Sequence, residues 1–194
     1  MQNVVFQAVA TANDEDKASS LRRQQRIVVW SIVLSVPAAA LLAFGLDRLL
    51  PPLSTGATLA ERIALALRCD VPVLLTMIVG VHVIANIRLR SAAIDPIRYV
   101  ESPSFRVHAR YLTNTHEQVT IYVVATAALA TLVDGAWLRI LPISAAVFVV
   151  GRILFWIGYA REPAWRAPGI SLNMLVYSAV LLLAVVRLIA MIAR

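Results

Sequence analysis

Polar side chains lead into an apolar run in the segment RYLTNTHEQVTIYVV, which begins at Arg110. A helix turns once in about 3.6 residues, so Arg110, Asn114 and Glu117 are expected to share one helical face. An arginine binds a carboxylate through two parallel hydrogen bonds, and a carboxylate binds an ammonium group. The pattern therefore predicts either a site for a small ligand that carries carboxylates and an amine, or an internal clamp between helices.

A second group of polar residues follows in GRILFWIGYAREPAWRAPG, which begins at Gly151. Arg152 and Tyr159 are seven residues apart and are expected to share a helical face, with further arginines just beyond it. An unpaired charge at the centre of a membrane helix costs roughly 2.5–3.5 kcal/mol, so an ion pair between Glu117 and Arg152 is one structural hypothesis. Such a pair leaves Arg166 and its neighbours unused, and this surplus of cations favours the ligand site.

The composition indicates which elements hold these residues, because 60% of the chain is hydrophobic, only 15% is charged and the mean hydropathy is +0.76. Soluble domains are nearer half apolar and a quarter charged, so we predict an all-α integral membrane protein. The expected organisation is a polar cytoplasmic tail at 1–26, an extra N-terminal transmembrane helix at 27–49 and a four-helix transmembrane bundle at 62–194. The spans of this bundle are expected at about residues 62–90, 107–133, 139–160 and 170–194.

The distribution of charge predicts an orientation in the membrane. Eleven of the 18 basic residues fall in segments that are cytoplasmic if the N-terminus is inside, and five fall in the opposite segments. This bias predicts that the N-terminus and the arginine-rich loops at 88–110 and 161–169 are cytoplasmic. The arginines lie at helix ends rather than on one soluble face, so nucleic-acid binding is not expected. The single Cys69 excludes a disulfide within the chain, and no spacing of Cys and His predicts a metal site.

The two polar segments also resemble a known family. RYLTNTHEQ resembles the R-x-x-x-N-x-x-E signature of the MAPEG family, the membrane-associated proteins of eicosanoid and glutathione metabolism. The segment GRILFWIGYAREPAWRAPG resembles its second signature, a G-R-x-x-x-x-x-G-Y run followed by R-A-P. The resemblance covers about residues 66–194, which leaves the first span as an addition. It implies a MAPEG-type four-helix bundle that assembles as a homotrimer, with glutathione bound as a co-substrate between neighbouring subunits.

The resemblance implies binding roles for individual residues. Arg110, Asn114 and Glu117 match the glutathione-binding Arg, Asn and Glu of the family, and Tyr159 matches the tyrosine of its second signature. We add Arg152 to this glutathione-binding set, because it shares a helical face with Tyr159.

Catalytic roles are implied for three further residues. Arg166 matches an arginine that stabilises the thiolate in the leukotriene-forming synthase, and Arg90 matches a second arginine proposed to assist there. Ser171 falls where the prostaglandin E synthase has a serine proposed to activate the thiol. A guanidinium beside a thiol favours the charged form and lowers the thiol pKa.

We therefore expect a glutathione S-transferase or peroxidase of the bacterial inner membrane, acting on lipophilic electrophiles from the lipid bilayer. The alternative hypothesis, from a different functional class, is a non-catalytic binding or scaffold protein with the same bundle. Gln118 stands where several glutathione-using members have Tyr, and Phe155 stands where they have Tyr or His, which favours the alternative. The complete set of Arg110, Asn114 and Glu117 favours the enzyme.

Overall fold

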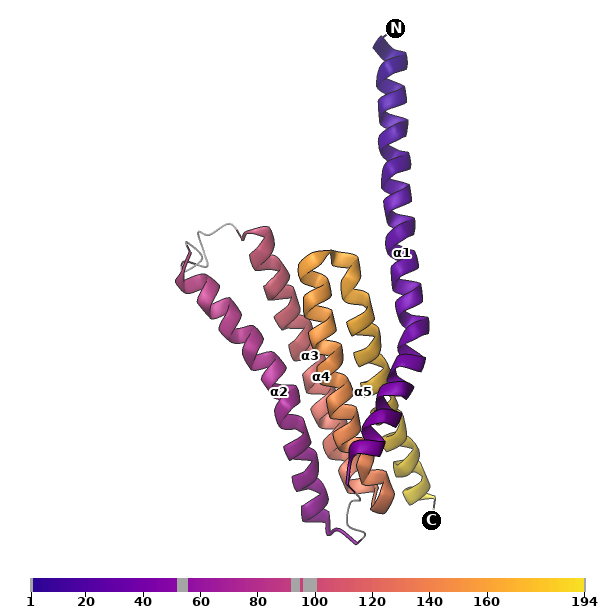
Figure 1. Ribbon diagram of the computed structural model, residues 1–194, viewed down its shortest axis with the longest axis vertical. Coiled ribbons are helices and arrows are strands. Elements are labelled where there is room, and N and C mark those ends of the chain that lie inside the picture. The colour runs from indigo at the N-terminus through magenta and orange to yellow at the C-terminus, as the bar shows by residue number, and fades with distance from the viewer. Residues whose placement is uncertain (1, 52–55, 92–94, 96–100, 194) are drawn as a thin grey trace.

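The computed structural model describes residues 2–51, 56–91, 95 and 101–193, and every regular element within them is helical. The long helices are α1 (Gln2–Leu49), α2 (Leu59–Leu89), α3 (Pro103–Leu132), α4 (Ile140–Arg161) and α5 (Ala167–Ile192) (Figure 1). Two short 3-10 helices, η2 (Gly135–Arg139) and η3 (Pro163–Arg166), precede α4 and α5. The predicted all-α class is confirmed. Residues 52–55, between the predicted extra helix and the four-helix bundle, and residues 92–94 and 96–100 of the predicted 88–110 loop lie outside the described residues.

The described helices are suited to a membrane. Four segments are long and apolar enough to cross one: Lys17–Leu49, Leu59–Leu89, Gly135–Arg161 and Pro163–Ile192. Large apolar side chains such as Leu75 in α2 and Leu182 in α5 are exposed on their outer faces, where a soluble protein rarely shows contiguous apolar surface. Helix α3, which carries the first polar segment, packs against α2, α4 and α5. The prediction of an integral membrane helical bundle is confirmed.

Helix α1 combines the predicted tail and the predicted extra span in one element. It begins at Gln2 and continues through Pro37 without a break. Its 48 residues extend about 72 Å at about 1.5 Å per residue, more than twice the ~30 Å thickness of the hydrocarbon core. Its first half projects beyond the other helices, and its second half packs against α5 and α4 (Figure 1). The segment expected to be a polar tail is therefore helical.

Side-chain caps set where two of the bundle helices begin. Thr58 and Glu61 form a capping box at the start of α2, in which the Glu61 carboxylate accepts from the Thr58 N–H at 2.7 Å. Ser102 caps α3 by accepting from the Phe105 N–H at 3.1 Å, and Pro103 follows at the first helical position. As a result α3 begins at residue 103 rather than near the predicted 107, which places Arg110 about two turns inside the helix.

The apolar core lies between α2, α3, α4 and α5. Tyr122 of α3 and Phe148 of α4 pack with ring centroids 4.7 Å apart, and both are fully buried. The hydroxyl group of Tyr122 makes a 2.8 Å hydrogen bond with Ser144, so the phenol is satisfied inside the bundle. Val73 of α2 and Val180 of α5 belong to the same cluster.

Successive helices alternate in direction, which gives the bundle two distinct ends. The start of α1, the end of α2, the start of α3 and η3 lie at one end, and the C-terminus lies at the other (Figure 1). At this second end the Arg139 Nε donates to the Asp47 carboxylate at 2.6 Å, and the guanidinium also reaches the backbone carbonyls of Leu50 and Pro51. These contacts hold the C-terminal end of α1 on the bundle. The described parts of both arginine-rich loops share the first end; which side of the membrane that end faces stays a prediction.

Candidate ligand-binding cleft

A cleft with a volume of about 250 Å³ opens at the first end of the bundle, where α3, α4, η3 and α5 meet. Its lining residues are Arg110, Thr113, Asn114, Glu117, Phe155, Tyr159, Arg166 and Ile170. The structure therefore brings together Arg110, Asn114, Glu117, Tyr159 and Arg166 from two segments that are far apart in the sequence. The remaining predicted site residues lie elsewhere.

Helix α3 forms the polar wall of the cleft. Arg110, Asn114 and Glu117 all line it, as their helical spacing predicts. Arg110 and Glu117 are exposed in the single chain, whereas Asn114 is half-buried. Neither charged group forms an ion pair with any described residue, so a cation and an anion both remain available to a ligand.

Close backbone packing positions the opposite wall. Gly158, near the end of α4, lies so close to the backbone carbonyl of Trp165 that a Cβ atom would overlap the oxygen. Gly169 of α5 lies in the same way against the backbone of Phe155 and Gly151. Only glycine permits these approaches, which draw η3 and the first turn of α5 onto α4. The glycine spacing of the second segment is thus what brings η3 to the cleft.

Arg166 lies at the end of η3 and is exposed at the edge of the cleft. Its Cζ atom lies 5.1 Å from the centroid of the Tyr159 ring, within range of a cation–π interaction. This contact orients the guanidinium, and no carboxylate among the described residues pairs with it. An uncompensated positive charge therefore faces the cavity.

The hypothesis of a Glu117–Arg152 ion pair is wrong for this chain. Arg152 is fully buried, and its Nη1 donates to Asn114 Oδ1 at 3.1 Å and to Thr115 Oγ1 at 3.3 Å. Its Cζ lies 4.7 Å from the Phe155 ring centroid. Arg152 therefore lies behind the cleft and does not line it. Because Asn114 accepts from Arg152 through its oxygen, its amide nitrogen is left to donate into the cavity.

Aromatic packing supports the contact between α3 and α4 and includes two residues that line the cleft, Phe155 and Tyr159. The rings of Tyr111 and Trp156 stack with centroids 4.3 Å apart, and the Trp156 Nε1 donates to His108 at 3.1 Å. Phe155 packs against Tyr111 on one side and against Tyr159 on the other, with centroids 5.7 Å apart in each case. Phe155 contributes an apolar surface to the cleft, at the position where the family resemblance implies a polar ring.

A second cavity lies beside the cleft, between α1 and the η3–α5 segment, with a volume of about 600 Å³. We call it the α1–α5 groove; its lining includes Val28 and Ile32 of α1 and Met174 of α5. Arg166 and Ile170 line both the groove and the cleft. The two cavities, one polar and one mainly apolar, therefore meet at the end of η3.

Two predicted catalytic residues lie outside the cleft. Ser171 is buried and lines the α1–α5 groove. Arg90 caps the C-terminal end of α2 and is exposed, away from the cleft lining. Within one chain, Arg90 therefore does not join Arg166, and its catalytic role stays a prediction.

Asp70 is a buried acidic residue outside the two polar segments. It lies in α2 with 1% of its surface exposed, and its carboxylate oxygens accept from the Thr126 hydroxyl at 3.0 and 3.1 Å. The sequence contains a signal for this buried carboxylate, because Asp70 is an acidic residue within the apolar run that follows Arg68. Charged residues within membrane spans usually face the interior of the bundle and pair with internal partners. Asp70 is not part of the cleft lining.

Comparison with known proteins shows that most of the bundle matches the model of one protein family. The model of the MAPEG family matches residues 69–186, from α2 into α5. Transmembrane protein 79 of Bos taurus is 27% identical over 129 residues, which cover 64% of this chain and 31% of that protein. Transmembrane protein 79 of Mus musculus is likewise 27% identical over 129 residues, which cover 64% of this chain and 32% of that protein. The chain spans about a third of the length of these curated relatives.

Proposed function

The chain belongs to the MAPEG family, and from this premise we propose that it is a membrane-bound glutathione S-transferase or peroxidase acting on lipophilic electrophiles. The observation that carries the proposal is that Arg166 lines both the polar cleft and the mainly apolar α1–α5 groove. A thiol bound in the cleft and an apolar substrate bound in the groove would meet beside this guanidinium.

The charges of the cleft complement those of glutathione, which carries two carboxylates, one ammonium group and one thiol. Arg110 is proposed to bind a carboxylate through two parallel hydrogen bonds, and Glu117 to bind the ammonium group. Asn114, oriented by Arg152, is proposed to donate a hydrogen bond from its side-chain N–H to a peptide carbonyl of the ligand. Tyr159 offers its hydroxyl on the opposite wall, beside Arg166.

The cleft of a single chain is too small and too exposed to enclose glutathione. Its volume of about 250 Å³ lies below the ~300–1,000 Å³ that is usual for small-molecule sites. Arg110 and Glu117 are also exposed at its rim. We propose that a neighbouring subunit of a homotrimer completes the site, and that this neighbour supplies Arg90 from the end of its α2.

The catalytic step follows from the charge on Arg166. A nearby guanidinium stabilises the thiolate, so the thiol of bound glutathione loses its proton to solvent at a lower pH than the free thiol does. The thiolate sulfur then forms a bond to an electrophilic carbon of the apolar substrate, and the displaced group leaves with the bonding electron pair. The buried Ser171 hydroxyl in the α1–α5 groove is proposed to donate a hydrogen bond to the reacting sulfur or to the leaving group.

Binding of glutathione to the detergent-purified chain tests the first part of this proposal. A ligand that binds only the folded state stabilises it, by about 2.7 kcal/mol when its concentration is 100 times the dissociation constant. We expect glutathione to raise the melting temperature, and Arg110→Ala to abolish the increase. Arg161→Ala is the matched control, because Arg161 is exposed at the end of α4 and does not line the cleft. No increase with the wild-type chain would contradict the proposal.

A non-catalytic binding protein remains the second candidate function, and the apolar surface of Phe155 within the cleft favours it. Under that hypothesis the cleft binds glutathione or a related anion, but the thiol keeps the pKa of free glutathione. Measurement of that pKa in the complex distinguishes the two functions.

A further inference from the structure

A third cavity lies between α1 and the bundle, separate from the α1–α5 groove. It has a volume of about 630 Å³, and α1 forms one wall while Leu154 of α4, Trp165 of η3 and Leu172 of α5 contribute to the other. We call it the α1–α4 groove; among the described residues, only Ser35 lines both this groove and the α1–α5 groove. Because the family match covers residues 69–186, the α1 wall comes from a part of the chain outside that match.

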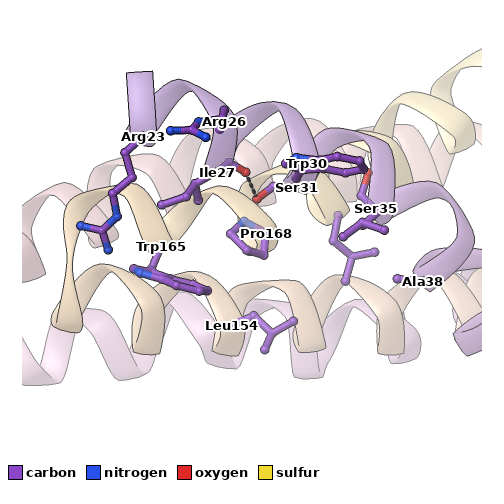
Figure 2. A pocket seen from close by; sticks show the side chains of 12 residues that line it. Arg23, Arg26, Ile27, Trp30, Ser31, Ser35, Ala38, Leu154, Trp165 and Pro168 are labelled. Atoms are coloured by element: carbon purple, nitrogen blue, oxygen red, sulfur yellow. Dashed lines mark hydrogen bonds between the residues drawn. The ribbon is translucent and has the colours of Figure 1, made fainter. Parts of the chain in front are cut away.

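The polar side chains of the α1–α4 groove gather at one end. Arg23 and Arg26 lie at that end on α1, and Ala38 lies towards the other (Figure 2). Two serines lie between them, but their hydroxyls are satisfied by the helix itself. Ser31 donates to the Ile27 carbonyl at 2.6 Å, and Ser35 donates to the Ile32 carbonyl at 2.7 Å. The groove therefore presents cationic groups at its mouth and an apolar interior that needs no hydrogen bonds.

The charge at the mouth is only partly compensated. Arg23 and Arg26 are three residues apart and so lie on one face of α1. Arg23 forms an ion pair with Glu162 at 3.5 Å, and both side chains are at least partly exposed. Arg26 has no ion-pair partner among the described residues. Two cations thus face one carboxylate, which leaves a net positive charge for an anionic ligand.

The depth of the groove matches one leaflet of a bilayer. Trp165 lines the groove at its charged end, below Arg23, and half of its surface is exposed (Figure 2). Trp30 begins one turn beyond Arg26 on α1, and its exposed ring extends towards Ser35. Tryptophan is enriched where lipid headgroups meet the hydrocarbon. From Arg26 to Ala38 the helix rises about 18 Å at about 1.5 Å per residue. Half of the hydrocarbon core is about 15 Å thick, so the apolar interior extends over the depth of one leaflet.

We propose that the α1–α4 groove binds one anionic phospholipid, with its phosphate at Arg23 and Arg26 and an acyl chain along Leu34 towards Ala38. The lipid fills the space between α1 and the bundle, and so holds the helix in place at the end opposite to the Arg139–Asp47 contact. Basic pockets between membrane helices bind anionic headgroups in this way. The proposal does not depend on glutathione chemistry.

Native mass spectrometry of the full chain in a neutral detergent tests this site. Titration with a dioleoyl phosphatidylglycerol is expected to give one retained lipid per chain, and dioleoyl phosphatidylcholine is expected to bind at least tenfold more weakly. Inorganic phosphate and glycerol phosphate, which lack acyl chains, are expected not to bind measurably. Equal retention of the neutral lipid, or equally tight binding of glycerol phosphate, would overturn the proposal.

Substitutions distinguish a specific site from general attraction of anionic lipids. Loss of a charge-assisted contact in Arg26→Ala is expected to weaken retention of the anionic lipid by about tenfold or more. Arg22→Ala is the matched control, because Arg22 is exposed on the same helix but does not line the groove. General attraction to a basic residue corresponds to roughly fivefold, so the control is expected to lose no more than that. Equal losses in the two variants would refute the site.

A second variant tests the apolar interior without changing the charge. Leu34→Trp is expected to fill the groove and to weaken lipid retention, while helicity and melting temperature in detergent without added lipid stay close to those of the wild type. Retention unchanged by Leu34→Trp would contradict binding within the groove. If the groove is instead covered by a second copy of the chain, Leu34→Trp would change the oligomeric state and leave phosphatidylglycerol retention intact, which would also overturn the proposal.

Discussion

Arg166→Ala is the substitution that separates catalysis from binding most clearly. Arg166 lies at the edge of the cleft with its guanidinium over the Tyr159 ring, and it holds no carboxylate among the described residues. Its loss is therefore expected to cost little stability, because exposed charges contribute little to folding. If the guanidinium stabilises the thiolate of bound glutathione, its loss raises the pKa of that thiol, since only the charged form is stabilised.

The expected size of the pKa change follows from Coulomb's law. Two unit charges about 4 Å apart interact by roughly 1 kcal/mol in water and roughly 4 kcal/mol at an effective dielectric constant of about 20. Arg166 is exposed in the single chain, so the lower value applies more closely, and one pKa unit corresponds to about 1.36 kcal/mol. We expect an increase of about one unit. A change from about 7.5 to about 8.5 lowers the thiolate fraction at pH 7 roughly eightfold, from about 24% to about 3%.

A pH titration of the ultraviolet absorbance of the thiolate measures this pKa in the glutathione complex. The conjugation rate at pH 7 is expected to fall in parallel in Arg166→Ala, whereas glutathione affinity changes less. Arg161→Ala controls for loss of any cation at this end of the bundle and is expected to leave the thiol pKa unchanged. If the wild-type chain binds glutathione without lowering its thiol pKa, or if both variants raise it equally, the proposed activation by Arg166 is refuted.

Three further predictions test the binding role, the packing and the topology. Glu117→Gln is expected to weaken glutathione binding by about tenfold or more, because a charge-assisted contact is lost. The melting temperature is expected to stay unchanged, because Glu117 forms no ion pair within the described residues. Unchanged glutathione affinity by calorimetry would remove Glu117 from the site. Gly158→Ala is expected to destabilise the chain by about 1–3 kcal/mol and to reduce glutathione binding, because the added methyl group overlaps the Trp165 carbonyl oxygen. A free energy of unfolding equal to that of the wild type in chemical denaturation would show that the position of η3 does not depend on this contact. On a Cys69→Ala background, single cysteines in the N-terminal segment and in the 88–110 loop are expected to react with a membrane-impermeant reagent from the same, cytoplasmic side, and labelling from opposite sides would contradict the topology.

Local patterns were sufficient for several features of this protein. The apolar composition and the length of the hydrophobic runs predict membrane helices, because a bilayer penalises every unsatisfied backbone group. The spacing of Arg110, Asn114 and Glu117 predicts one polar face, because helical periodicity depends only on the backbone. The family resemblance, carried by the two polar segments, predicts which residues of α4 and η3 accompany them. Four of the five residues predicted to bind glutathione (Arg110, Asn114, Glu117 and Tyr159) line one cavity together with Arg166, whereas the fifth, Arg152, is not part of its lining.

Local patterns did not predict that the helix of the first span extends back to the N-terminal segment. The charged and polar side chains of the first 26 residues predict a tail, yet α1 begins at Gln2. Helix propagation adds a hydrogen bond for each residue that it orders, so a stable span extends helical structure into its flanking segment. The polar composition indicates where the segment leaves the membrane but not whether its backbone is helical.

Pairing between helices was decided by the tertiary structure alone. The sequence places Arg152 and Glu117 in neighbouring spans, and electrostatics favours their pairing, but Arg152 contacts Asn114 and Thr115 instead. Helical periodicity determines which side chains share a face, whereas the rotation and height of two packed helices determine which faces meet. Here the close contacts of Gly158 and Gly169 set the position of η3 and α5 on α4. The same packing leaves the α1–α4 and α1–α5 grooves beside α1, and it places Arg166 between the cleft and the α1–α5 groove. Such cavities depend on tertiary structure, because they arise only where the surfaces of separate helices leave space unfilled.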